Sequence, residues 1–364
     1  MPEPPFSHDP DVHRAETPPG SFYSDPAAYA AQAALFARSW QLVTPPLPQR
    51  EHATPWTLLP ACLDEPLLLT RDAGGVARCL SNVCTHRGAQ VLHEACAAKA
   101  LRCGYHGRRF GLDGCLKGAP GFEGALDFPR PSDDLPALPL EAWGPLSFTS
   151  VDPAQPFATF REPLDHWLGG LPWERAQRAP EADRDYPVAA HWALYVENYL
   201  EGLHIPYVHQ GLVQALDFGS YRYASTPSGT IQIGVAPEGD PTLALPAGHP
   251  AGERVAAIYV WCFPNLMLNV YPWGLSLNLV EPSGPSSSRI RYQRWVWAPE
   301  LQDQGAGGDL ERVEYEDQAV VEAVQRGIGS RLYRRGRYAP AHEAGTHHFH
   351  RLVLAALGAN DKQA

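Results

Sequence analysis

Residues 84–107 read CTHRGAQVLHEACAAKALRCGYHG, and this stretch decides the fold of the domain around it. It contains two short cysteine–histidine pairs: Cys84 and His86 form one (C-x-H), and Cys103 and His106 form the other (C-x2-H) after an interval of 16 residues. Two tight loops of this kind offer two thiolates and two imidazoles when they lie together. Short apolar runs separated by glycine turns surround the stretch and predict a small all-β unit that carries both loops.

Two cysteines and two histidines can hold either an iron–sulfur cluster or a zinc ion. In a Rieske [2Fe–2S] cluster, two histidines replace two cysteines on one of the irons. This chemistry predicts Cys84 and Cys103 on one iron and His86 and His106 on the other. Structural zinc is the alternative, because it also accepts two cysteines and two histidines. Zinc sites more often pair like with like, so the mixed pairs favour the Rieske cluster.

A second group of candidate ligands lies in residues 191–209, HWALYVENYLEGLHIPYVH. The pattern predicts a helix that runs as far as His204, with Glu201 on the same face because it lies three residues earlier. Pro206 is expected to end or kink this helix. The chain can then turn back so that His209 approaches His204, and the two imidazoles can reach one metal ion.

The third ligand is expected from residues 310–328, where apolar residues recur at helical spacing. Asp317 falls on that apolar face, whereas Glu314 and Glu316 are expected elsewhere on the helix. A lone carboxylate on an apolar face is costly to bury unless it is paired or binds a metal. The two histidines and Asp317 would form the two-histidine, one-carboxylate site of mononuclear non-haem Fe(II) oxygenases, which leaves open positions for O2.

Composition and charge narrow the class of protein. The net charge of −11 argues against nucleic-acid and anionic-membrane partners, which require basic surface. The sequence has neither an apolar N-terminal leader nor a run of about 18 apolar residues, so we expect no membrane span and a cytoplasmic location. Its seven cysteines are an odd number spread over the chain, which favours metal binding over a disulfide framework.

The length of 364 residues predicts more than one domain. We expect an N-terminal arm and helix over residues 1–40 that packs on the catalytic domain, a Rieske domain over 41–151, and a catalytic domain over 152–364. In residues 152–364, predicted strands are grouped with flanking helices, and there is no regular βαβ alternation. That arrangement predicts an α+β fold with an antiparallel sheet.

The chain resembles the α (oxygenase) subunit of Rieske non-haem iron oxygenases, in the ring-hydroxylating dioxygenase superfamily. The matching stretches are CTHRG, CGYHGRRFGLDG, VENYLEGLHIPYVH and EDQAVVEAVQRGI, which are spread over most of the chain. The resemblance implies a Rieske β domain and a START-like, helix-grip catalytic domain. It also implies one [2Fe–2S] cluster and one mononuclear Fe(II) per subunit, a homotrimer, and an NAD(P)H-dependent reductase or ferredoxin as partner.

In the family that the chain resembles, an acidic residue, commonly Asp, links a histidine of the cluster to a histidine of the iron. Glu201 matches that position, and Asn198 lies three residues before it as a second catalytic candidate. A Glu at this place resembles the branch that oxidises choline, carnitine and glycine betaine. Gly104 departs from the family, in which Pro is common, and this change leaves the ligands untouched.

The resemblance implies a terminal oxygenase component that hydroxylates or demethylates a small organic substrate with O2. We expect a quaternary or N-methylated amine, because a strand near residue 260 puts Tyr259, Trp261 and Phe263 on one face. Such rings can cage a methylated ammonium by cation–π attraction, although core packing also explains them. The alternatives are an aromatic-ring dioxygenase or O-demethylase and, outside the class, a Rieske electron carrier or a zinc-stabilised lipid-binding protein.

Overall fold

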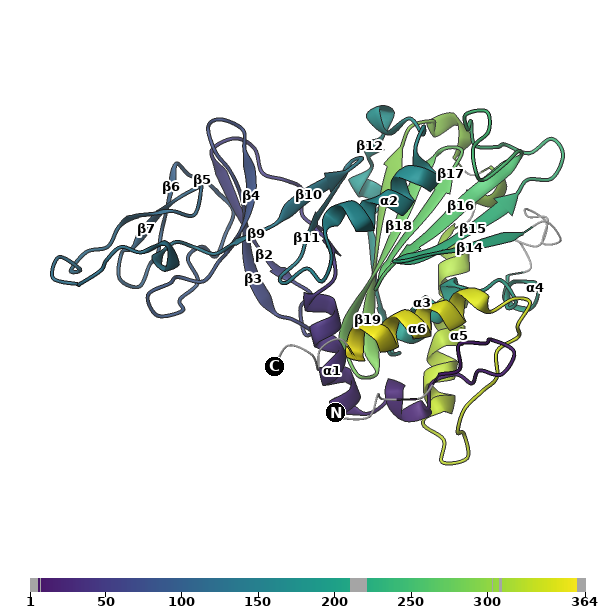
Figure 1. The fold of residues 1–364 in the computed structure, drawn as a ribbon. Coiled ribbons are helices and arrows are strands. Elements are labelled where there is room, and N and C mark those ends of the chain that lie inside the picture. Colours follow the sequence, from purple (N-terminus) through teal and green to yellow (C-terminus); the bar gives the residue numbers. More distant parts are fainter. Residues whose placement is uncertain (1–5, 7, 210–220, 303, 308–309, 359–364) are drawn as a thin grey trace. The chain divides into compact units, whose positions relative to one another are not determined.

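The computed structural model describes residues 6, 8–209, 221–302, 304–307 and 310–358. Parts of the predicted arm, residues 1–5 and 7, lie outside this description. The chain divides into two compact units: the smaller comprises Trp40–Ala154, and the larger combines Met1–Ser39 with Gln155–Ala364. Figure 1 labels their helices and strands. Among the described helices, none is both long and apolar enough to cross a bilayer.

The smaller unit is built from three antiparallel sheets, as expected for short strands joined by glycine turns. The largest has the order β5-β2-β3-β4-β9, and the others have the orders β6-β7-β8 and β1-β11-β10. Side chains from the first two sheets share one core, which includes Leu68, Leu80, Leu101 and Phe110. The strands are β1 Gln41–Leu42, β2 His52–Leu58, β3 Glu65–Arg71, β4 Ala77–Ser81, β5 Cys96–Ala97, β6 Ala100–Arg102, β7 Arg109–Gly111, β8 Leu116–Gly118, β9 Ala137–Leu138, β10 Leu140–Trp143 and β11 Leu146–Thr149, with a 3-10 turn at Pro131–Asp133.

The larger unit contains an eight-stranded antiparallel sheet in the order β12-β19-β18-β17-β16-β15-β14, with β13 also paired to β19. All of β17 and most of β18 are buried, so the centre of the sheet is covered on both faces. The strands are β12 Gln177–Arg178, β13 Arg184–Val188, β14 Arg222–Thr226, β15 Gly229–Val235, β16 Val255–Cys262, β17 Leu266–Tyr271, β18 Gly274–Gly284 and β19 Ser287–Val296.

Helices pack beside this sheet (Figure 1), where α3 contacts β18 and α5, and α6 contacts β14 and β15. The predicted α+β class, with an antiparallel sheet and a long helix, is confirmed. The helices are α1 Pro26–Ala37, α2 Phe157–Leu168, α3 Trp192–Tyr199, α4 Ile205–Val208, α5 Leu310–Ile328 and α6 Ala344–Gly358, with 3-10 turns at Gly20–Tyr23, Trp173–Arg175, Pro180–Ala182, Pro299–Leu301 and Gly305–Gly307.

The predicted helix from Trp192 to His204 is wrong in its second half, because α3 ends at Tyr199 and a separate helix, α4, begins at Ile205. The side chain of Glu201 holds the turn between them by accepting hydrogen bonds from the backbone N–H groups of Leu203 and of His204, the latter at 3.2 Å. Pro206 therefore does not end a helix; it lies in the first turn of α4, where its missing N–H costs nothing.

Candidate metal centres and their cavity

Two loops of the smaller unit carry the predicted cluster ligands, and their backbones follow one hydrogen-bond pattern. The N–H of each cysteine donates to the carbonyl five residues later, at 2.8 Å for Cys84 and 2.9 Å for Cys103. The N–H of the glycine four residues after each cysteine donates back to it, at 3.0 Å for Gly88 and 3.1 Å for Gly107. Both glycines have positive φ, 71° and 74°, which other residues rarely adopt. Each cysteine therefore begins a tight loop of the same shape.

The four side chains form two close pairs, one of cysteines and one of histidines. The thiols of Cys84 and Cys103 are buried, and the ring centroids of His86 and His106 lie 4.6 Å apart. Burial raises the pKa of Cys84, and the neighbouring Cys103 thiol adds to this shift. Nδ1 of His86 is buried without a hydrogen-bond partner among the described residues, so it is available as a ligand atom. A pair of thiols and a pair of imidazoles fit the ligands of a Rieske cluster, with one pair on each iron.

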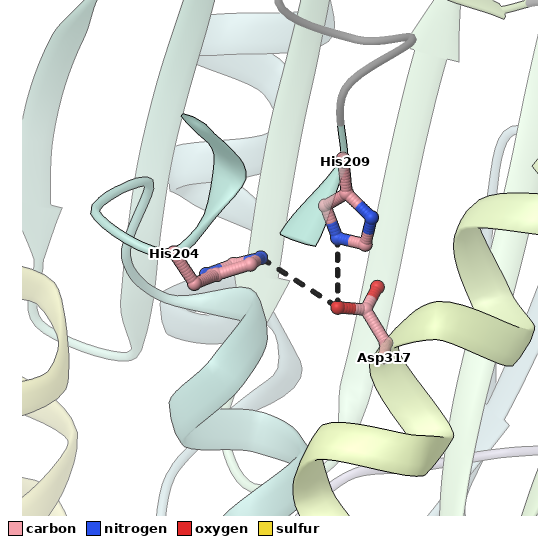
Figure 2. Close-up of side chains that lie close together, drawn as sticks. All are labelled: His204, His209 and Asp317. Atoms are coloured by element: carbon pink, nitrogen blue, oxygen red, sulfur yellow. Dashed lines mark hydrogen bonds and ion pairs between the residues drawn. The ribbon is translucent and has the colours of Figure 1, made fainter. Parts of the chain in front are cut away.

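In the larger unit, α4 and α5 bring the second predicted ligand set together (Figure 2). Asp317 Oδ1 lies 2.9 Å from Nε2 of His209 and 3.6 Å from Nε2 of His204. One ligand atom from each of the three residues can be chosen so that all lie within 4.8 Å of one another. The side chain of His209 is 2% exposed, and that of Asp317 is 14% exposed. The spacing and the donor types suit a mononuclear iron that keeps open coordination positions.

Each imidazole of this set is held from behind by a carboxylate. Nδ1 of His204 lies 2.6 Å from Glu201 Oε1, and Nδ1 of His209 lies 2.8 Å from Glu316 Oε2. A carboxylate at Nδ1 places the proton there and directs the lone pair of Nε2 toward the metal. Both histidines therefore present Nε2 toward Asp317.

The local charge at His209 favours a cation. Burial by itself lowers the pKa of His209, but hydrogen bonds and charge from Asp317 and Glu316 outweigh burial and give a net rise. The hydrogen bond from His209 in turn lowers the pKa of Glu316. Carboxylates that stabilise positive charge between them also suit a divalent metal ion.

A cavity opens beside the three ligand residues and is lined mainly by tyrosines and amides. Burial raises the pKa of Tyr259 to about 12. It also raises the pKa values of Tyr199 and Tyr271 well above the usual value for a tyrosine. These phenols therefore stay neutral near pH 7. The tyrosines of the lining are Tyr195, Tyr199, Tyr221, Tyr259 and Tyr271, and the amides are Asn198, Gln232, Asn269 and Asn278.

Glu314, one turn before Asp317 on α5, also lines this cavity. Its Oε2 accepts hydrogen bonds from the hydroxyl of Tyr195 at 2.5 Å and from the hydroxyl of Tyr292, and its Oε1 accepts one from the Asn278 amide at 3.3 Å. Burial, with a further contribution from the charge of Asp317, raises the pKa of Glu314 to about 7.

Comparison with known proteins identifies the family. Residues 176–359 match the family model of the ring hydroxylating alpha subunit (catalytic domain), and residues 55–130 match that of the Rieske [2Fe-2S] domain. The chain belongs to the Rieske ring-hydroxylating alpha-subunit family. This Rieske oxygenase is 30% identical to the chloroplastic choline monooxygenase of Arabidopsis thaliana over 362 residues, which cover 94% of this chain and 83% of the relative. The carnitine monooxygenase oxygenase subunit of Escherichia coli K12 is 30% identical over 363 residues, with 93% of each chain covered.

Solved structures share the fold of this Rieske oxygenase. A quaternary ammonium Rieske monooxygenase, described as giving insights into carnitine oxidation by gut microbiota and inter-subunit electron transfer, matches with a TM-score of 0.74 at 24% identity over 96% of both chains. Naphthalene 1,2-dioxygenase from Rhodococcus matches with a TM-score of 0.73 at 20% identity, over 96% of this chain and 95% of its own. At these identities the matches bear on the fold alone.

The predicted enzyme class and cofactors are confirmed: the family is one of non-haem iron oxidoreductases with a [2Fe–2S] cluster and a mononuclear iron. The assignment of individual ligands stays a prediction, which the geometry of the two donor sets supports. Glu201 lies beside His204, and Asn198 lines the cavity, as their predicted catalytic roles require.

The structure does not bring the three predicted substrate residues together around the cavity. Tyr259 lines it, whereas Trp261 packs edge-on against Phe263 and against Phe349 of α6. The three side chains share a face of β16 and its extension, but α6 covers one end of that face. Trp261 is fully buried there, and its indole N–H donates to Pro264 O at 3.1 Å. Core packing, the alternative explanation, therefore describes Trp261.

Sequence reasoning missed two acidic residues of α5. Glu314 and Glu316 were expected away from the ligand face, but Glu314 lines the cavity and Glu316 bonds to His209. Leu310, Val313, Glu314 and Asp317 follow the i, i+3, i+4, i+7 spacing of one helix face, which is a sufficient signal for Glu314. Glu316 reaches His209 from beside that face, and no local pattern marks it.

Proposed function

We propose that this chain is the terminal oxygenase component of a system that oxidises a quaternary or N-methylated amine with O2. The observation that carries the proposal is the cavity beside His204, His209 and Asp317, whose lining combines neutral tyrosine rings with a carboxylate. Aromatic faces attract quaternary ammonium groups. The choline and carnitine monooxygenases among the relatives support the same class of substrate.

The residues of the cavity have distinct proposed roles. His204, His209 and Asp317 hold the iron, which when bound supplies O2 activation at the wall of the cavity. Glu201 and Glu316 keep the Nδ1 protons in place and so orient both imidazoles. The tyrosines bind the ammonium group and exclude water, and Asn198 offers an amide for a polar group of the substrate.

We propose that Glu201 also links the two metal centres. Glu201 Oε1 accepts a hydrogen bond from His204 Nδ1, and Oε2 accepts two from the backbone of the turn. A carboxylate has about four lone-pair sites, so Oε1 can still accept a hydrogen bond from a histidine of a cluster. By family resemblance we propose a homotrimer in which the cluster of one subunit serves the iron of the next, with electrons from an NAD(P)H-dependent reductase or ferredoxin. None of the seven cysteines is in a disulfide, and we also propose the cytoplasmic location expected from the sequence.

A substrate screen with the reconstituted oxygenase tests the proposal. The purified enzyme, a reductase and NADH are incubated with choline, carnitine, glycine betaine and simple aromatic acids, while formaldehyde and hydroxylated products are both measured. Amine-dependent product formation coupled to NADH oxidation is expected. Products from the aromatic acids alone would contradict the proposal and favour a ring dioxygenase or O-demethylase.

A further inference from the structure

We infer that Glu314 is the counter-charge for the ammonium group of the substrate, and that the cavity selects cationic amines that carry no carboxylate. The inference rests on the proposed function, because it specifies the substrate of the same cavity. Three observations carry it: the partners of Glu314, its place on α5, and the absence of Lys and Arg from the described lining.

Glu314 differs from the other carboxylates of the cavity wall in its partners. Glu201 and Asp317 bond to the imidazoles of the metal site, whereas Glu314 bonds to the hydroxyls of Tyr195 and Tyr292 and to an amide. Among the described residues, no Lys, Arg or His lies within ion-pair distance of Glu314. Neutral donors hold this carboxyl group in position and burial raises its pKa to about 7, so a cation in the cavity would stabilise its charged form.

The place of Glu314 suits a substrate that reacts at the metal site. Glu314 lies three residues before Asp317 on α5, which corresponds to about 4.5 Å of helix rise. A methylated ammonium beside Glu314 therefore has its carbon substituents close to the position of the iron. Tyr195 contributes both to the wall of the cavity and to the hydrogen bonds that fix Glu314.

The described lining of the same cavity offers no permanent positive charge to an anion. None of its described lining residues is Lys or Arg. Residues 210–220, which connect the lining residues His209 and Tyr221, lie outside the description, and their sequence QGLVQALDFGS also contains no Lys or Arg. A carboxylate on the substrate would therefore lie near Glu314 and Asp317 without a described Lys or Arg to pair with, and like charges at short range repel. A hydroxyl group can instead bond to the amides of the wall.

Matched ligands test this inference on the iron-loaded holoenzyme. Dissociation constants are measured for choline, for its uncharged carbon isostere 3,3-dimethylbutan-1-ol, and for glycine betaine, which adds a carboxylate. The wild type should bind choline at least about tenfold more tightly than either other ligand. Glu314→Gln, which keeps the size and the acceptor oxygen, should lose this preference while its affinity for the neutral alcohol stays within about twofold.

Two further variants keep the test decisive. Glu322→Gln makes the same charge change on α5 but outside the cavity, where the side chain accepts a hydrogen bond from Ala189 N, and it should bind all three ligands like the wild type. Glu314→Asp keeps the charge and should keep the preference for choline, even if Glu314→Gln fails to fold. An unchanged choline-to-alcohol ratio in Glu314→Gln, loss of the preference in Glu314→Asp, or equal binding of betaine and choline by the wild type would overturn the inference. A wild type that oxidises no quaternary or N-methylated amine would instead contradict the proposed function itself.

Discussion

Glu201 and Glu316 show how single side chains position the metal site from outside it. Each accepts a hydrogen bond from Nδ1 of one histidine. The distance from Nδ1 to the carboxylate oxygen is 2.6 Å for His204 and 2.8 Å for His209. Such outer carboxylates fix the orientation and the basicity of the ligand, and their loss typically lowers metal affinity. The metal-binding strength of the site therefore depends on residues that do not touch the metal.

Glu316→Gln tests this dependence, because an amide accepts only a weaker hydrogen bond from His209. Iron affinity at the mononuclear site should fall about 10- to 100-fold. Iron retained against increasing chelator concentrations measures the change, with Glu322→Gln on the same helix as the control. Iron retention equal to that of the wild type would show that Glu316 does not support the ligand.

At the residue scale, candidate ligands can be read from the sequence more easily than the residues that surround them. The spacing of Cys84, His86, Cys103 and His106 was informative because short loops fix which donors lie together. The tyrosines of the cavity were not predictable in this way, because strand register brings them together: Tyr259 on β16 pairs with Asn269 on β17, and both line the cavity. No local pattern contains such a register.

At the element scale, strong local signals were accurate and weak ones were not. The predicted bounds of α5, Leu310–Ile328, agree with the structure. The helix expected to reach His204 was wrong, because the carboxylate of Glu201 bonds to the backbone of a turn that helical spacing does not reveal. A side chain that competes for backbone N–H groups overrides periodicity.

His191, at the N-terminus of α3, makes the stability of the larger unit depend on pH. His191 is fully buried, its Nδ1 accepts a hydrogen bond from Ala193 N at 3.2 Å, and burial lowers its pKa to about 3. An unfolded histidine titrates near 6.5, so between pH 6.5 and pH 3 the unfolded state binds a proton that the native state does not. Stability from this group is therefore complete above pH 6.5 and falls by about 1.4 kcal/mol for each pH unit below it.

His191→Asn should remove that contribution while the amide oxygen preserves a cap for the helix. The variant is expected to be less stable at pH 7, because it leaves space in a packed site, but its stability should fall less on acidification. Between pH 7 and pH 5, the wild type should lose about 2 kcal/mol more than the variant. Urea unfolding midpoints at both pH values measure the difference. Parallel losses in the two proteins would contradict the pKa of His191.

At the scale of the whole molecule, two metal centres have to act as one enzyme. The predicted fold class followed from strand grouping and from motifs spread over the chain, and the family comparison confirms it. The substrate was less accessible to sequence reasoning, because α3, α5 and several strands contribute the lining of one cavity. Only the folded structure places Glu314 among those tyrosines.

Glu201→Gln tests the proposed link between the centres. Cluster iron and sulfide should stay at wild-type levels, and turnover is measured with added Fe(II), which keeps the mononuclear site loaded despite the weaker hydrogen bond to His204. Turnover should fall by at least about 100-fold, with electron transfer from the reduced cluster as the slow step. Rapid-mixing spectroscopy of cluster oxidation, together with steady-state turnover, measures both. Turnover near the wild-type value would exclude the bridging role.

The metal content of purified wild type and Asp317→Ala tests the central claim most directly. We expect about three irons and two sulfides per wild-type chain, with two irons in the cluster and one at His204, His209 and Asp317. Asp317→Ala should retain about two irons, two sulfides and an unchanged cluster spectrum, and lose substrate oxidation. Three irons in Asp317→Ala, or zinc without sulfide in the wild type, would contradict the account.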